Sequence, residues 1–185
     1  MYQSTKTLGH KLGMKNCHSR LLDKARCLGL REPADLEWLA VARGCWHYRQ
    51  PEMPESVRVD ESLFSNEELA IALLSPNQLY SPHTIRLGAA MLGAPGNSPL
   101  IIAELALGEG AGIPVRYIAK AAAQFEPENP FWDELLQKLS DTVEPPDGVL
   151  PHPTRFVSMT GFTRNGAGRI VVWIRPRKDL AIVHG

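Results

Sequence analysis

Apolar residues recur at helical spacing in short segments along most of the chain, and proline or glycine separates one segment from the next. This pattern predicts an amphipathic helix over residues 16–30 and a second helix over 34–43, where Pro33 suits the first turn and Gly44 suits a stop. Further helices, each bounded by its own serine, proline or glycine signals, are predicted over about 65–74, 81–92, 98–107, 114–125 and 130–141.

The clearest helix start is at Ser65, three residues before Glu68 and just before the apolar run LAIALL. The serine hydroxyl can accept a bond from a free amide of the first turn, and the glutamate can return one to the serine amide. Residues 27–29 and 91–93 resemble each other, which hints at stacked helix-pair repeats. Because any two antiparallel helices in a bundle look similar, we favour coincidence.

Residues 99–107 form the most apolar of these helices, and Glu104 is the one charged residue in it. A helix that is apolar on all sides is typical of the centre of a bundle, so we expect this helix to be buried. A buried carboxylate needs a partner. We favour an ion pair of Glu104 with Arg86 or Arg116; the alternative is a general acid or base in a cleft, which makes Glu104 a catalytic candidate.

After a proline-rich connector, the apolar period changes to two, and Asn165-Gly166 is typical of a type I′ hairpin turn. That turn predicts pairing of residues whose numbers sum to 331. One face is then an apolar core face, made of Val157, Met159, Ile170, Val172 and Ile174. The other face places Phe156 beside Arg175, Ser158 beside Trp173, Thr160 beside Val171 and Phe162 beside Arg169. Since an isolated hairpin is marginally stable, we expect it to pack on the helices, join a partner's sheet or gain a third strand from residues 57–59.

Together these elements predict a mainly α fold, a compact bundle of about six or seven short helices with a C-terminal β-hairpin arm. The expected divisions are a basic N-terminal arm (1–15), a helical domain (16–143, with a loop at about 50–64), a proline-rich connector (144–153), the hairpin (154–176) and a tail (177–185). A chain of 185 residues with 44% hydrophobic and 22% charged residues is ordinary for a globular protein. No apolar run approaches the roughly 20 residues that span a bilayer, so no membrane contact is expected.

The net charge of zero hides a segregation of charge along the chain. Residues 1–31 carry seven basic side chains and one acidic side chain, and residues 151–185 carry six and one. Residues 32–150 carry seven basic and eighteen acidic side chains. We favour the interpretation that the basic ends fold back onto the acidic centre; the alternative is that they bind a polyanion.

Arginine beside aromatic rings is also the combination that stacks on unpaired bases. The same pairs fit cation–π packing within a hairpin, so the residues alone do not separate the two interpretations. The candidate contacts with nucleic acid or with a protein partner are Phe156, Phe162, Arg164, Arg169, Trp173, Arg175, Arg177, Lys178, Lys6, Lys11 and Lys15.

The candidate metal ligands are Cys17, Cys27, Cys45 and His47. Zinc sites usually use cysteines two to four residues apart, whereas these cysteines are ten and eighteen positions apart. We therefore expect Cys27 and Cys45 to be small core residues and expect no metal. Three cysteines cannot all pair, which favours a reducing, cytoplasmic setting.

The chain has no phosphate-binding loop, no dinucleotide fingerprint, no HExxH and no GxSxG, so no cofactor is expected and an enzyme of unidentified chemistry is the third alternative. The leading interpretation is a non-enzymatic helical module for protein–protein interaction, or an adaptor, whose hairpin packs on the helical body, on a protein partner or on a second copy. The second interpretation is a nucleic-acid-binding protein that uses the basic N-terminal arm and the Arg/aromatic face of the hairpin.

Overall fold

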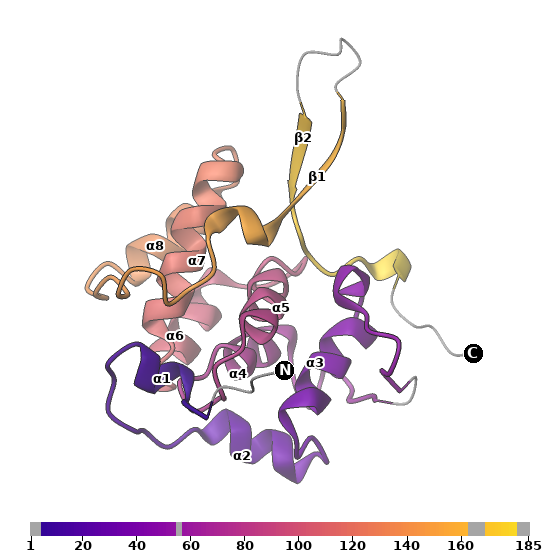
Figure 1. Ribbon diagram of the computed structural model, residues 1–185, viewed down its shortest axis with the longest axis vertical. Helices are drawn as coiled ribbons and strands as arrows, with labels where there is room; N and C mark the ends of the chain where they lie inside the picture. The colour runs from indigo at the N-terminus through magenta and orange to yellow at the C-terminus, as the bar shows by residue number, and fades with distance from the viewer. Residues whose placement is uncertain (1–4, 55–56, 163–168, 181–185) are drawn as a thin grey trace.

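The chain folds into a bundle of short helices from which a C-terminal β-hairpin projects (Figure 1). The computed structural model describes residues 5–54, 57–162 and 169–180. Its α-helices are α1 (Leu8–Lys11), α2 (Arg20–Cys27), α3 (Pro33–Ala42), α4 (Asn66–Leu73), α5 (Pro82–Leu92), α6 (Pro99–Gly108), α7 (Gly112–Phe125) and α8 (Pro130–Lys138). Short 3₁₀ turns are η1 (Trp46–Tyr48), η2 (Pro153–Phe156) and η3 (Lys178–Leu180), and the strands are β1 (Val157–Phe162) and β2 (Arg169–Trp173). The predicted mainly helical fold with a C-terminal hairpin is confirmed.

Local capping explains where the helices begin. The Ser65 hydroxyl accepts a hydrogen bond from the Glu68 amide at 3.1 Å, and the Glu68 carboxylate accepts one from the Ser65 amide at 2.9 Å. The predicted capping box at the start of α4 is therefore confirmed. The helix predicted over residues 16–30 is shorter, because Ser19 caps α2 directly before Arg20.

The centre of the bundle is formed by α4 and α5, and not by α6 as predicted. The run Leu69, Ala70, Ile71, Ala72, Leu73 and Leu74 is completely buried. In α6, only Ile102, Ala103 and Ala106 are buried against the neighbouring helices. The prediction was wrong because a helix that is apolar on all sides carries no pattern that says which side faces solvent.

The predicted basic N-terminal arm contains α1, and this helix packs on the loop between α4 and α5. The Leu8 amide donates to the Gln78 carbonyl, and the Gly9 amide donates to the Pro76 carbonyl, both at 2.8 Å. Gly9 lies so close that an added Cβ would be 2.9 Å from the Pro76 Cβ. The segment around α1 is therefore part of the folded body.

The hairpin register differs from the predicted one along most of its length. Phe162 pairs with Arg169, which sums to 331, but the four pairs from Thr160–Ile170 to Val157–Trp173 sum to 330. Gly161 is an extra residue on β1 at this point and forms a bulge, which shifts the register by one. The predicted turn at residues 165–166 lies outside the described residues, and residues 57–59 do not join the two-stranded sheet.

None of the helices in the described part of the chain has both the length and the apolar character that crossing a bilayer requires.

Candidate protein interaction site

The base of the hairpin is built into the helical core. Trp173 and Phe156 are each 1% exposed, and their ring centroids lie 5.6 Å apart. The Trp173 ring also lies 5.5 Å from Trp132 of α8, and its indole nitrogen donates to the Ala89 carbonyl of α5 at 3.3 Å. This aromatic cluster fixes the direction in which the rest of the hairpin leaves the body.

An ion pair follows directly after β2 and holds the chain beside α7 and α8. Arg175 Nη2 donates to both carboxylate oxygens of Glu126, at 2.6 and 2.7 Å. The same carboxylate accepts hydrogen bonds from Trp132 Nε1 at 2.7 Å and Asn129 Nδ2 at 3.1 Å. Partial burial by itself raises the pKa of Glu126, but these hydrogen bonds and the Arg175 charge outweigh it and lower the pKa below its ordinary value.

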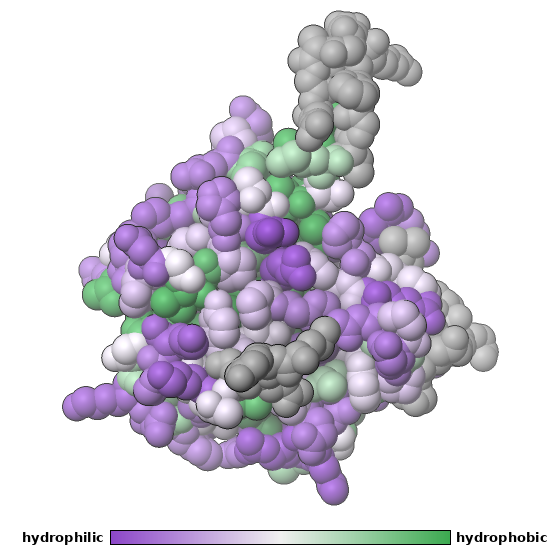
Figure 2. All heavy atoms as spheres, in the orientation of Figure 1, coloured by the Kyte–Doolittle hydropathy of each residue, from purple (hydrophilic) through white to green (hydrophobic). Residues whose placement is uncertain are grey.

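Above this base, the hairpin exposes apolar side chains on both faces. Met159 and Val171 pair across the strands and share one face, with 50% and 37% of their surfaces exposed. Ile170 and Val172 lie on the other face, 47% and 46% exposed. Figure 1 shows the strands rising clear of the helices, and Figure 2 shows apolar residues (green) gathered at the foot of the hairpin.

Strand β2 has the composition of a strand from the middle of a sheet. Ile170, Val171 and Val172 are consecutive and apolar, which is typical of strands covered on both faces and paired on both edges. Within the described residues, however, β2 pairs only with β1. Its other edge therefore presents unpaired backbone amides and carbonyls beside apolar side chains, an arrangement that favours pairing with another strand.

The mixed Arg/aromatic face does not form as predicted. Phe162 pairs with Arg169 as expected, but the register of 330 over the rest of the hairpin separates the other three predicted pairs. Phe156 and Trp173 are in the core, Arg175 binds Glu126, and the exposed Arg177 binds Asp179 at 2.5 Å. The other candidates in the described chain that face solvent are Lys178, Lys6, Lys11 and Lys15. Lys11 lies over the Tyr80 ring. Arg164 and the side chains of Phe162 and Arg169 lie outside the described residues.

The expected folding of the basic ends onto the acidic centre is confirmed at two places. Lys24, from the basic N-terminal region, pairs with Glu68 at 2.6 Å. Arg175, from the basic C-terminal region, pairs with Glu126 at 2.6 Å. At these two points the basic charge of the ends is therefore neutralised within the molecule.

Glu104 is exposed on α6, which contradicts the expectation that it is buried. Neither predicted partner binds it in the described structure. Arg116 pairs with Glu144, and the Arg86 guanidinium lies 5.6 Å from the centre of the Tyr48 ring. Glu104 instead lines an open groove between α6 and α2.

The cysteines lie in different surroundings and not around one centre. Cys45 is buried with its sulfur 3.5 Å from that of Met91, as expected for a small core residue, whereas Cys27 is exposed and that part of the prediction is wrong. Cys17 is exposed, as is His47. No three His, Cys, Asp or Glu side chains in the described ranges lie close enough together to hold a metal ion.

Two features of this surface were missed from the sequence. Glu126 lies 49 positions before Arg175, and no local pattern links the two residues. The exposure of Ile170 to Val172 was missed because a run of β-branched residues looks the same in a buried strand and in an exposed one.

Comparison with protein-family models, curated proteins and solved structures gave no significant match.

Proposed function

We propose that this protein is a protein–protein interaction module that binds a partner through the free edge of β2. The observation that carries the proposal is the run Ile170, Val171 and Val172, which is apolar on both faces of a strand whose outer edge pairs with no other described strand. The partner is a protein that offers an exposed strand edge, so that main-chain hydrogen bonds extend the sheet and apolar side chains cover its faces.

The rigid base of the hairpin supports this function. Phe156 and Trp173 anchor the strands in the core, and the Arg175–Glu126 pair holds the segment that follows. A strand that is already extended and fixed in direction loses little conformational freedom on binding, which favours affinity. Nucleic acid is disfavoured as the ligand, since the two described aromatic rings of the predicted binding face are buried.

The test is site-specific photo-cross-linking in the cells that make the protein. A photoreactive residue replaces Ile170 in one variant and Gln137, an exposed residue of α8, in a control variant. We expect a discrete protein adduct at position 170 and none at 137, with the adduct mapping to a strand edge of the partner.

Two substitutions on the same face of the hairpin make the test specific for the β2 edge. Val171→Lys places a charge on β2, and Met159→Lys places the same charge on its cross-strand neighbour in β1. We expect the first to abolish the adduct and the second to reduce it less. An adduct of twice the chain mass would identify a second copy as the partner. An RNA adduct, or none at all, would overturn the proposal.

A further inference from the structure

A second surface lies away from the hairpin, where α2 and α6 both pack against α4 and leave a groove between them. The groove has a volume of about 770 Å³ and is open to solvent. One wall is the start of α2 and the other is the outer side of α6. The hairpin and this groove share no residues.

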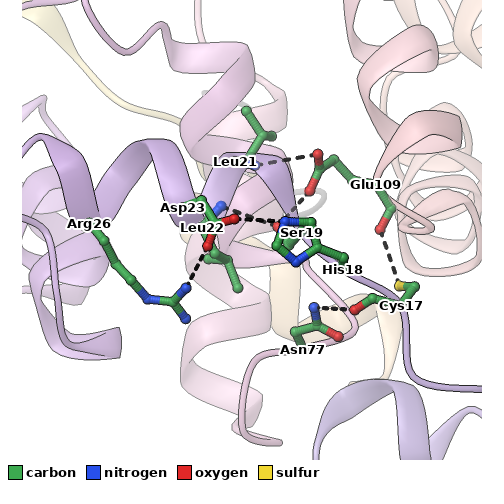
Figure 3. Close-up of polar contacts among 9 residues, drawn as sticks. All are labelled: Cys17, His18, Ser19, Leu21, Leu22, Asp23, Arg26, Asn77 and Glu109. Atoms are coloured by element: carbon green, nitrogen blue, oxygen red, sulfur yellow. Dashed lines mark hydrogen bonds and ion pairs between the residues drawn. The ribbon is translucent and has the colours of Figure 1, made fainter.

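Glu109, one of the residues that line the groove, joins its two walls through polar contacts (Figure 3). Glu109, which follows α6, is buried and accepts a hydrogen bond from the Ser19 hydroxyl at 2.5 Å and from the Leu21 amide at 3.3 Å. The carboxylate thus caps the N-terminus of α2 and ties it to the turn after α6. These contacts hold the two walls at a fixed distance, so Glu109 has a structural role.

The α6 wall presents an apolar stripe at helical spacing. Ile101, Leu105 and Gly108 occur at i, i+4 and i+7, so they lie on one side of the helix. Ile101 is 46% exposed, and Leu105 and Gly108 line the groove. No atom lies within 4 Å of the position that a Cβ on Gly108 would occupy, so the backbone of another chain can approach closely there.

The two walls carry opposite charges that form no ion pair within the described part of the chain. Arg20 on α2 and Glu104 on α6 are both exposed, and neither forms an ion pair with any described residue. Lys24, an exposed basic side chain that also lines the groove, is neutralised by Glu68. A polyanion would meet the Glu104, Glu68 and Glu109 carboxylates, so the charges do not suit nucleic acid.

We infer that this groove binds an amphipathic helix of a partner protein. The apolar side of the partner helix would lie along Ile101, Leu105 and Gly108. An acidic residue of the partner helix would face Arg20, and a basic residue would face Glu104. Helix-in-groove binding uses this combination of apolar anchors at i, i+4 and i+7 and complementary charges at the flanks. With the hairpin, the chain would hold two partners on separate surfaces, which is the property of an adaptor.

The test uses a fluorescent synthetic helix of about 15 residues with leucines at i, i+4 and i+7, glutamates on one flank and lysines on the other. A second peptide has the two flanks exchanged, and a third has the same composition in scrambled order. Fluorescence anisotropy is measured with the full-length protein. We expect saturable binding of one flank arrangement, weaker binding of its exchange and none of the scrambled peptide.

Charge reversals then locate the binding site. Arg20→Glu or Glu104→Lys alone should weaken binding about 5-fold or more, and both together should reverse the preference between the two flank arrangements. Gly108→Leu should abolish binding by filling the groove, and it leaves the fold intact because the position is open. Lys138→Glu on α8 is the matched control and should change nothing.

Equal binding of all three peptides, or affinities unchanged by the double reversal and by Gly108→Leu, would overturn the inference. Because Val171→Lys lies on the hairpin, it should leave peptide binding unaffected. The proposal for the groove and the proposal for the β2 edge can therefore be refuted independently of each other.

Discussion

The Arg177 amide donates a hydrogen bond to the Gly44 carbonyl at 3.2 Å, which joins the end of α3 to the segment after the hairpin. Gly44 has φ of +117°, a conformation that residues with a Cβ rarely adopt. A Cβ added at Gly44 would lie 2.4 Å from the Arg177 carbonyl oxygen. The glycine thus allows two backbone segments from opposite ends of the chain to touch.

Gly44→Ala should therefore destabilise the protein by about 2–4 kcal/mol, through backbone strain together with displacement of the Arg177 backbone. Gly96→Ala is the matched control, because Gly96 also has positive φ (+86°) but has no atom within 4 Å of its Cβ position. The control should lose only about 1–2 kcal/mol. Urea unfolding of the two variants measures the difference, and equal losses would contradict the close contact.

The Arg175–Glu126 pair should contribute measurably to stability, since its Arg175 and Glu126 side chains are only 32% and 19% exposed. Glu126→Gln keeps the shape and an acceptor for Trp132 but removes the charge facing Arg175. We expect a loss of about 1–3 kcal/mol in thermal or urea unfolding. Asp179→Asn breaks the Arg177–Asp179 pair, which is more than 60% exposed on both sides, and should cost less than Glu126→Gln because solvent screens an exposed pair.

The cysteines should differ in reactivity with iodoacetamide. Burial raises the pKa of the Cys45 thiol to about 12, so this cysteine is neither accessible nor ionised at pH 8. Cys17 and Cys27 are exposed. Mass spectrometry of the native protein should show two adducts, with a third after unfolding in urea. Rapid addition of three adducts to the native protein would contradict the burial of Cys45.

Most helix positions could be predicted because helices such as α4, α5, α6 and α8 carry their own start signal within a few residues, whereas α1 was missed and α7, which has no side-chain cap, begins two residues before the predicted start. Ser65 with Glu68, and proline in the first turn of α5, α6 and α8, act locally and need no knowledge of the rest of the fold. The burial of α6 could not be predicted in the same way. Leu100, Ile101 and Leu107 are exposed, and which side of α6 faces solvent depends on how many helices pack around it. That number is a property of the whole bundle.

The candidate sites depend on such long-range arrangements even more strongly. One extra residue, Gly161, shifts the register so that Trp173 pairs with Val157 and not with Ser158, and both Phe156 and Trp173 lie in the core. Arg175 of the predicted Arg/aromatic face proved to pair with Glu126, 49 positions earlier, whereas Arg177 pairs with its near neighbour Asp179. The charge segregation predicted that such pairs form, but the choice of partner requires the fold.

The stability that Glu126 provides should depend on pH, and the sign follows from its lowered pKa. A glutamate in the unfolded chain has a pKa of about 4.3, whereas folded Glu126 stays ionised to lower pH because of its hydrogen bonds and the charge of Arg175. Its contribution is therefore complete above the unfolded pKa and is lost as pH falls from there through the folded pKa.

Hydrogen bonds from Lys120 and Arg116 also lower the pKa of Glu144, so the wild-type curve of stability against pH mixes several groups. The difference in unfolding free energy between wild type and Glu126→Gln isolates this residue. It should be constant from pH 7 to 5 and shrink below about pH 4.5, and a difference that stays constant down to pH 3 would show that the carboxylate is not held ionised by Arg175.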